Sequence, residues 1–248
     1  MSLAPGVVVR AADIGAEQIV AGVSSRTLVA TAPGEAGLVR RLAELAPRAR
    51  LQGRAGGGGE LWFVIEGSGL LEAAGQPALR LQPDRAVLLP PGSTYDVSAG
   101  ESAGLRLDLV SLPAAGRGEA GAAGQAHKHA TPLSRDFARC EIETTGDRQF
   151  RVLFGPGRDC EVATQFVGEI PPGRAPDHSH PYDEVVLILR GEGIAHIGGA
   201  VHALTEGSCA HLPPGLVHCL ENTGSGTLRV LGVFHPADSP AAKLANDH

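Results

Sequence analysis

The sequence predicts an all-β protein made of two tandem β-barrels, and three observations lead to that fold class. The 248-residue chain contains 34 Gly and 18 Pro, well above the combined roughly 12% of an average protein, and this favours many turns over long helices. Apolar and polar residues alternate over short stretches, as they do in half-buried strands. Two blocks of sequence also repeat along the chain, so each half is expected to form one barrel.

The repeat links two pairs of motifs. Glu60-Leu-Trp-Phe-Val-Ile-Glu-Gly67 matches Glu184-Val-Val-Leu-Ile-Leu-Arg-Gly191 at an offset of 124 residues. Leu89-Pro-Pro-Gly92 matches Leu212-Pro-Pro-Gly215 at an offset of 123 residues. We therefore expect an N-terminal barrel over residues 1–112 and a C-terminal barrel over residues 127–248. Residues 113–126 between them are nearly all Ala, Gly and small polar residues, which is typical of a linker.

Individual strands follow from the alternation of residue types. Residues 160–170 and 105–109 have period 2 and are expected to be half-buried strands. Residues 185–189 are apolar throughout, which favours a strand that is covered on both faces. Residues 38–46 have helical spacing, yet the 124-residue offset aligns them with the strand at 162–170. We expect a strand there, because tertiary context often overrides local propensity.

Charge and termini exclude several classes of function. The chain has 21 basic and 27 acidic residues and a formal charge of −6, without a basic run. A nucleic-acid surface needs clustered Lys and Arg, so no nucleic-acid partner is expected. The N-terminus lacks a basic segment followed by a long apolar one, and no stretch has 18 apolar residues. We expect a cytoplasmic protein that binds no membrane and acts on a small molecule.

A cluster of metal-ligand residue types lies in the second half. His178 and His180 are two residues apart, so on an extended segment their side chains leave from the same face, and Glu184 keeps that parity. His218 follows a Pro-Pro-Gly turn that can bring it back across the sheet. Three neutral imidazoles and one carboxylate suit Mn, Fe, Ni, Cu or Zn, and they leave open positions on a six-coordinate ion. Other histidines of this half (His196, His202 and His211) are expected to be surface or supporting residues.

These residues, with the glycines and prolines between them, resemble the paired motifs of the cupin superfamily. The resemblance implies a double-stranded β-helix, a small jelly-roll-like barrel, in each half, with a metal inside the barrel. The first half departs from the ligand pattern. The positions that correspond to His178, His180, Glu184 and His218 are Arg54, Gly56, Glu60 and Tyr95. We therefore expect one divalent metal ion per chain, in the C-terminal barrel, and a structural N-terminal barrel.

A closer resemblance spans most of the chain. The two-barrel plan, the block GGGGELWFVIEG that ends at Gly67, Leu89-Pro-Pro-Gly-Ser93 and Phe166-Val-Gly-Glu-Ile-Pro-Pro-Gly173 are similar to the ureidoglycine aminohydrolase family, formerly called glyoxylate-induced proteins. That family implies a Mn-dependent hydrolase of purine-ureide (allantoin) breakdown that releases ammonia. Fe, Ni and Zn remain alternatives to Mn. The family's ligands are Glu, His, His and Gln, and its substrate-contacting Tyr and Lys fall on Leu231 and His235 here.

Three functions remain open on the sequence. The first is a metal-dependent aminohydrolase in which His235 or Tyr182 serves as the catalytic acid or base. The second is a metal-dependent dioxygenase, and the third is a bicupin that binds a small ligand without converting it. We also expect a homodimer or larger assembly, with Leu61 or Trp62 on the contact face.

Overall fold

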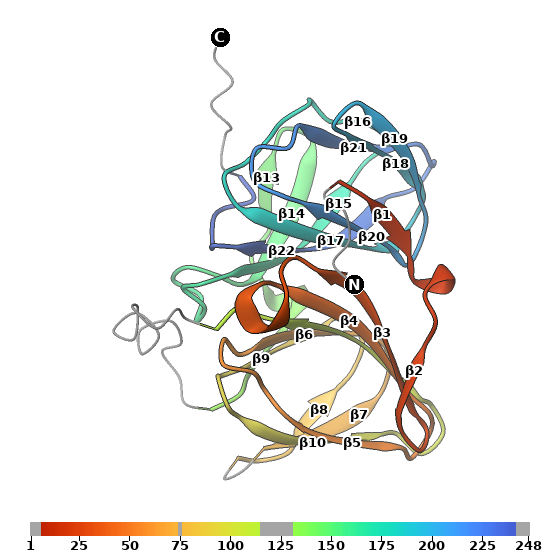
Figure 1. The fold of residues 1–248 in the computed structure, drawn as a ribbon, viewed down its shortest axis with the longest axis vertical. Coiled ribbons are helices and arrows are strands. Elements are labelled where there is room, and N and C mark those ends of the chain that lie inside the picture. The colour runs from red at the N-terminus through yellow and green to blue at the C-terminus, as the bar shows by residue number, and fades with distance from the viewer. Residues whose placement is uncertain (1–5, 74–75, 115–130, 242–248) are drawn as a thin grey trace. The chain divides into compact units, whose positions relative to one another are not determined.

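The computed structural model describes residues 6–73, 76–114 and 131–241. Strands and three short 3-10 helices (Ala11–Asp13, Gly34–Ala36 and Phe137–Arg139) make up its regular structure. In these described ranges no helix is long and apolar enough to cross a membrane. The chain divides into an N-terminal barrel, residues 14–139, and a C-terminal barrel, residues 140–248 together with 1–13. The all-β class and the two-barrel plan are therefore confirmed (Figure 1).

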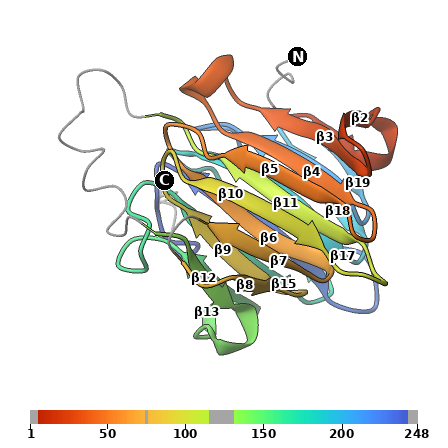
Figure 2. The same cartoon turned by 90° about the horizontal axis from the view of Figure 1, so that it is seen from below.

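The N-terminal barrel consists of two antiparallel sheets that face each other (Figures 1 and 2). The larger sheet has the strand order β12-β9-β6-β11-β4-β3-β2 and the smaller one β5-β10-β7-β8. The bounds are β2 Glu17–Val20, β3 Val23–Ala30, β4 Val39–Leu45, β5 Arg50–Arg54, β6 Glu60–Gly67, β7 Gly69–Ala73, β8 Leu79–Leu81, β9 Arg85–Leu89, β10 Thr94–Ala99, β11 Leu105–Ser111 and β12 Leu133–Asp136. Side chains from both sheets, among them Trp62, Leu81, Val97 and Leu107, form the core between them.

The C-terminal barrel repeats this plan. Its larger sheet has the order β1-β20-β17-β22-β15-β14-β13 and its smaller sheet β16-β21-β18-β19. The bounds are β1 Val8–Arg10, β13 Glu143–Thr145, β14 Arg148–Phe154, β15 Thr164–Ile170, β16 Gly173–Arg174, β17 Asp183–Arg190, β18 Gly193–Ile197, β19 Ala200–Leu204, β20 Ser208–Leu212, β21 His218–Asn222 and β22 Leu228–His235. An aliphatic core and a small aromatic cluster lie between the sheets.

The register of the strands reproduces the sequence repeat. Glu60 on β6 lies opposite Leu89 on β9, and Glu184 on β17 lies opposite Leu212 on β20. The two motifs of each half are therefore neighbours in one sheet. The segment with helical spacing is the strand β4, as the repeat predicts. Backbone pairing with β3 and β11 on its two sides outweighs its local helix propensity.

Two short strands fall outside the barrel to which the sequence assigned them. Val9 of β1 pairs with Cys209 of β20, so residues 1–13 belong to the C-terminal barrel. Leu133 of β12 pairs with Leu88 of β9, so residues up to 139 belong to the N-terminal barrel. Each strand covers an edge of a larger sheet, where backbone groups would otherwise lack partners. The bounds expected from the repeat, 1–112 and 127–248, miss both pairings, and most of the expected linker 113–126 lies outside the described residues.

Two apolar residues expected on an assembly face are in fact buried inside the chain. Leu61 and Trp62 have 0% of their surface exposed, and Trp62 belongs to the core of the N-terminal barrel. The expectation that either residue forms a contact with a second copy is therefore wrong. The sequence of β6 does not reveal the burial of both residues by alternation, because five consecutive residues of that strand are buried.

A buried ion pair joins β4 to β11. The alternation of residues 105–109 suggests that Asp108 faces solvent, but both Asp108 and Arg40 are completely buried. The Arg40 guanidinium donates to the carboxylate in a bidentate manner, from Nε to Oδ1 at 2.9 Å and from Nη2 to Oδ2 at 3.1 Å. Such a pair tolerates burial because each charge and its hydrogen bonds are satisfied by the other.

Removal of one partner of this pair should strongly destabilise the fold. Asp108→Ala leaves the Arg40 charge buried without its carboxylate, and we expect a loss of about 3–5 kcal/mol in the free energy of unfolding. The double variant R40M/D108L should recover much of that loss, because it buries no charge. Asp96→Ala, which breaks the exposed Arg50–Asp96 pair, is the control and should change little. Denaturant unfolding measures the free energy of unfolding of each variant. Equal losses of stability in D108A and D96A would contradict the importance of the buried pair.

Candidate metal centre

Three segments of the C-terminal barrel bring the predicted ligands together. His178 and His180 lie between β16 and β17, Glu184 lies near the start of β17, and His218 is the first residue of β21. The backbones of His178 and His218 form two mutual hydrogen bonds, with nitrogen-to-oxygen distances of 2.9 and 2.7 Å. Gly215 of the Pro-Pro-Gly turn has a φ of 76°, in the left-handed region that favours glycine, and its N–H donates to the His180 carbonyl at 2.8 Å. The turn thus holds β21 against the segment that carries the other histidines.

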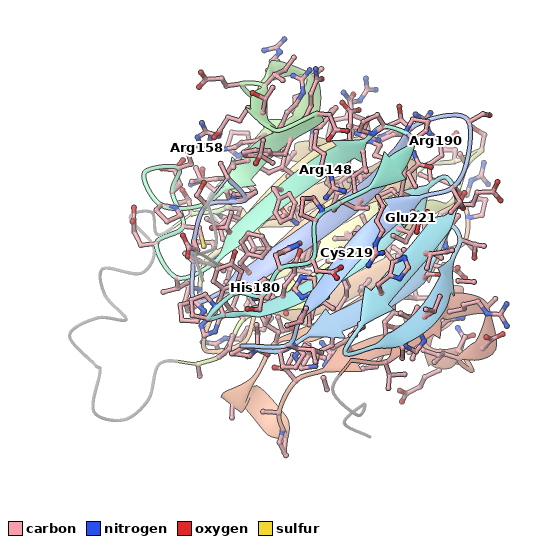
Figure 3. All side chains as sticks on the ribbon, turned by 90° about the horizontal axis from the view of Figure 1, so that it is seen from above. Arg148, Arg158, His180, Arg190, Cys219 and Glu221 are labelled. Atoms are coloured by element: carbon pink, nitrogen blue, oxygen red, sulfur yellow. The ribbon has the colours of Figure 1, made fainter. Side chains whose placement is uncertain are left out.

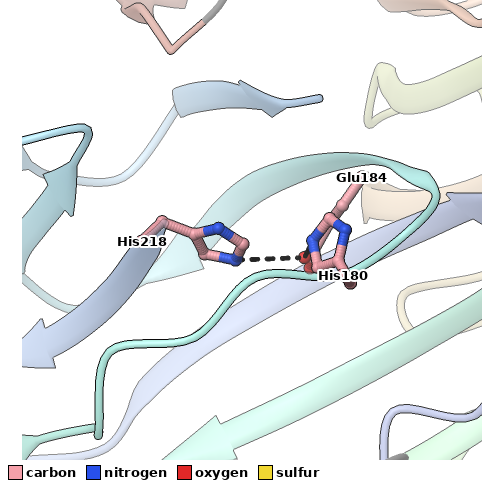
Figure 4. Close-up of side chains that lie close together, drawn as sticks. All are labelled: His180, Glu184 and His218. Carbon is pink, nitrogen blue, oxygen red and sulfur yellow. Dashed lines mark hydrogen bonds and ion pairs between the residues drawn. The ribbon is translucent and has the colours of Figure 1, made fainter. Parts of the chain in front are cut away.

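Three of the four predicted ligands converge on one point. Ligand atoms of His180, Glu184 and His218 all lie within 4.8 Å of one another, and the three residues are buried (Figure 4). His180 Nε2 lies 3.0 Å from Glu184 Oε2, and His218 Nε2 lies 3.8 Å from the same oxygen. This group is the one described cluster of at least three His, Cys, Asp or Glu residues with such spacing.

Backbone carbonyls fix the orientation of the imidazoles. His180 Nδ1 lies 2.7 Å from the Tyr182 carbonyl oxygen, and His218 Nδ1 lies 2.8 Å from the Leu216 carbonyl oxygen. A carbonyl only accepts hydrogen bonds, so Nδ1 carries the proton in both rings, and in the neutral rings Nε2 presents a lone pair to the cluster. Metal-binding histidines have this arrangement as a rule.

The arrangement of acceptors fits a cation. A neutral His180 ring and the Glu184 carboxylate place two lone pairs 3.0 Å apart, which is unfavourable unless a proton or a metal ion lies between them. His218 Nε2 is buried without a hydrogen-bond partner in the described part of the chain, and such an atom normally requires one. Burial lowers the pKa of His218, although the Glu184 charge opposes the effect. Burial therefore favours the neutral, metal-binding form of this ring.

His178 lies beside the cluster but outside it. Its ring centre is 4.4 Å from that of His218 and 6.5 Å from that of His180. Its Nδ1 lies 3.1 Å from the Pro176 carbonyl oxygen, and the side chain is more exposed than those of the other ligands. The orientation of its Nδ1 matches that of the other two rings, so its Nε2 is also available as a ligand.

A cavity of about 130 Å³ opens beside the cluster. Its volume is similar to that of an engineered cavity that binds benzene. The walls include Tyr182, which stacks on the His180 ring at 4.2 Å with an interplanar angle of 4° and also contacts Phe234. Burial, together with the nearby charges of Glu184 and Asp238, raises the pKa of Tyr182 well above its ordinary value. The Tyr182 phenol is therefore a hydrogen-bond donor rather than a base.

His235 does not reach this cavity. On β22, Val230 and Phe234 line the cavity, and successive side chains of a strand point to opposite faces. His235 consequently points away from the cavity, near Asp183, and its burial lowers its pKa. Leu231 lies on the same face of β22 as His235 and is fully buried. The two positions that the family alignment offered for substrate contacts are thus on the wrong face of β22.

Arg148 is a cavity residue that the sequence did not reveal. It begins β14 and lines the cavity together with Phe150, which lies two residues further along the same strand. A polar residue does not contribute to an alternation of apolar residues, and Arg148 also lies outside the repeated motifs. The apolar residues Phe150 and Val152, two positions apart, were the available signal. Arg148 lies two positions before Phe150, so in a strand its side chain is expected on the same face.

Aromatic side chains occupy the corresponding place in the N-terminal barrel. The rings of Trp62 and Tyr95 meet edge to face at 4.8 Å. Trp62 Nε1 donates to Glu60 Oε2 at 2.7 Å, so this carboxylate is engaged by the indole. Burial raises the pKa of Glu60 above its ordinary value and that of Tyr95 to about 12. The indole and phenol fill the interior where the other barrel has its histidines.

Comparison with known proteins agrees with this fold. Residues 166–234 match the family model described as a cupin domain. No curated protein matches the sequence significantly. Among solved structures, a putative glyoxylate-induced protein from Pseudomonas aeruginosa superposes with a TM-score of 0.75 at 15% identity, over 100% of this chain and 94% of that one.

Two further structures are similar. Ylba from E. coli has a TM-score of 0.72 at 14% identity, over 95% of this chain and 93% of the other. Bacillus subtilis oxalate decarboxylase has a TM-score of 0.73 at 14% identity, over 96% of this chain and 79% of the other. At such identities the similarity concerns the fold alone. The family-model match assigns a cupin domain to residues 166–234, and the structural similarity extends the same two-barrel fold over nearly the whole chain.

Proposed function

We propose that the C-terminal barrel is the active site of a metal-dependent hydrolase that acts on a small polar metabolite, with ureidoglycine-type aminohydrolysis as the reaction. The observation that carries the proposal is the buried convergence of His180, Glu184 and His218 at the wall of a small cavity. The motif resemblance to ureidoglycine aminohydrolases and the similar fold of a putative glyoxylate-induced protein support the choice of reaction.

The metal would be held by Nε2 of His180 and His218 and by the Glu184 carboxylate, with His178 as the fourth ligand. A bound divalent ion, Mn in our proposal, supplies Lewis acidity and a point of attachment for an oxygen or nitrogen of the substrate. Glu184 reduces the net charge of the centre. The carbonyls of Tyr182 and Leu216 hold the rings in position and keep Nε2 directed at the ion.

Tyr182 is the residue best placed to handle a proton during the reaction. It lines the cavity and stacks on a ligand, and its raised pKa keeps the phenol protonated. In our proposal it donates a hydrogen bond or a proton to the leaving group. The apolar walls contributed by Phe166 and Phe234 exclude bulk water from this side of the cavity and so strengthen that interaction.

Metal content tests the ligand assignment. Wild-type protein should bind one Mn²⁺ per chain, and His180→Ala or His218→Ala should each lose more than the ~10–100-fold in affinity that the loss of an outer partner costs. His196→Ala is a matched control, because His196 also pairs with a carboxylate, Glu221 at 2.8 Å, but belongs to no described three-residue cluster. Elemental analysis and metal titration provide the measurement. Equal retention of metal by H180A and H196A would contradict the assignment.

The pH dependence of metal binding tests His218 separately. Protons compete with metal for imidazole, whose ordinary pKa is about 6.5, so affinity should fall below about pH 6 with more than one proton taken up per ion released. Bound metal and the lowered pKa of His218 both move that midpoint down. His218→Gln should retain some Mn²⁺ affinity with a shallower pH dependence. Metal titrations at several pH values that gave the same slope for both proteins would exclude His218 as a ligand.

Activity assays distinguish the remaining functions. The Mn-loaded protein should release ammonia from ureidoglycine, and Tyr182→Phe should lower kcat by roughly 100-fold or more while metal content is unchanged. Oxygen uptake without ammonia release would favour the dioxygenase instead. Binding of the compound without turnover would favour a binding protein. A Y182F variant with wild-type kcat would remove Tyr182 from the proposed chemistry.

A further inference from the structure

One permanently charged basic residue lines the cavity of the C-terminal barrel. Among the described lining residues, Arg148 is the sole arginine or lysine and Glu184 the sole carboxylate. The other walls are mostly apolar, including Phe150, Phe166 and Val186. A cation in such surroundings is costly unless it meets an anion or several acceptors, so its presence requires an explanation.

The position of Arg148 places its guanidinium beyond the metal cluster and along the same cavity. Its Nη2 donates to the Leu220 carbonyl at 3.2 Å. Leu220 lies two residues after His218 on β21, which is roughly 7 Å along a strand. Figure 3 shows Arg148 and His180 within the same barrel. A small molecule attached to the cluster at one end could therefore meet the guanidinium at the other.

The guanidinium also has donors to spare for a ligand. Its described contacts are the Leu220 carbonyl and Asp147, whose carboxylate is 4.0 Å from Nε and whose side chain is 76% exposed. A guanidinium has five N–H donors in a planar fork that matches a carboxylate. Burial lowers the pKa of Arg148, but an arginine stays charged throughout the physiological range.

The charges of the cavity favour a negatively charged substrate. Glu184 neutralises part of a divalent ion, and Arg148 adds a positive charge further along the cavity. The histidine ligands are neutral when they bind a metal. The loaded site would therefore carry a net positive charge among mostly apolar side chains, where charge interactions are stronger than in water.

We propose that Arg148 is a specificity-determining residue that binds a carboxylate of the substrate at the end of the cavity remote from the metal. This inference rests on the proposed function and narrows it to small, elongated anions. A neutral molecule of the same shape would leave the guanidinium without its partner. Arg148 binds and orients the substrate, and the reacting atoms lie at the metal end.

Paired probes test this role without an assay of turnover. Malonate and its uncharged diamide, malonamide, have the same size and differ in charge. Isothermal titration calorimetry would compare wild type, Arg148→Met and Arg148→Lys, each in Mn-loaded and metal-free form. Arg151→Met is the matched control, since Arg151 is on the same strand but outside the cavity lining. Circular dichroism and metal content establish that each variant is folded and loaded.

We expect R148M to lose about tenfold or more in malonate affinity, with malonamide affinity unchanged, R148K intermediate and R151M like wild type. Equal malonate binding by R148M and wild type would overturn the proposal, as would an equal loss for both probes or a wild type without preference for malonate. Failure of the metal-dependent function is a separate result. If wild type binds no metal but its preference for malonate disappears in R148M, the role of Arg148 stands and the metal-dependent function does not.

Discussion

The candidate site depends on the backbone contacts that hold two distant segments of the C-terminal barrel together. His178 and His218 pair through their main chains, and the Gly215 N–H donates to the His180 carbonyl. These bonds set the separation of the His180 and His218 rings, which are 38 residues apart in the chain. The imidazoles then acquire their orientation from carbonyls within two residues of each ring. Without these contacts the histidines and Glu184 would have no common point.

The same barrel plan has different consequences in the two halves because different residues fill the interior. In the C-terminal barrel, histidines and a carboxylate leave a cavity beside them. In the N-terminal barrel, Trp62 and Tyr95 occupy the interior, and Glu60 accepts the indole hydrogen bond. The acid at the start of the apolar strand is thus common to both barrels. In the N-terminal barrel this acid contacts an indole and contributes to packing. In the C-terminal barrel it lies beside histidines and, in our proposal, binds the metal.

Much of this could be predicted from the sequence, because the informative features are local or repeated. The repeat identifies the two barrels and corrects the helical spacing of β4. The spacing of the histidines and the Pro-Pro-Gly turn indicates three residues that do converge, His180, Glu184 and His218. These features depend on strand parity and on turns, and both can be derived from short stretches of sequence.

The features that the sequence did not reveal depend on tertiary pairing or on a strand's parity outside the motifs. Strands β1 and β12 are too short to carry a pattern, so their partners follow only from the sheets. Asp108 looks like a solvent-facing residue until Arg40 is placed beside it. The family alignment suggested His235 for a substrate contact. Its neighbour Phe234 faces the cavity, so the side chain of His235 lies on the opposite face of the strand. Arg148 lies outside both repeated motifs.

X-ray diffraction at the manganese absorption edge tests the central claim most directly, because it locates the ion without reference to activity. Crystals of the Mn-loaded protein should give one strong anomalous peak in each chain, between His180, Glu184 and His218, which converge in the structure. A peak at the outer His196–Glu221 pair, or no peak under conditions in which the protein is saturated with Mn²⁺, would contradict the assignment of the metal centre.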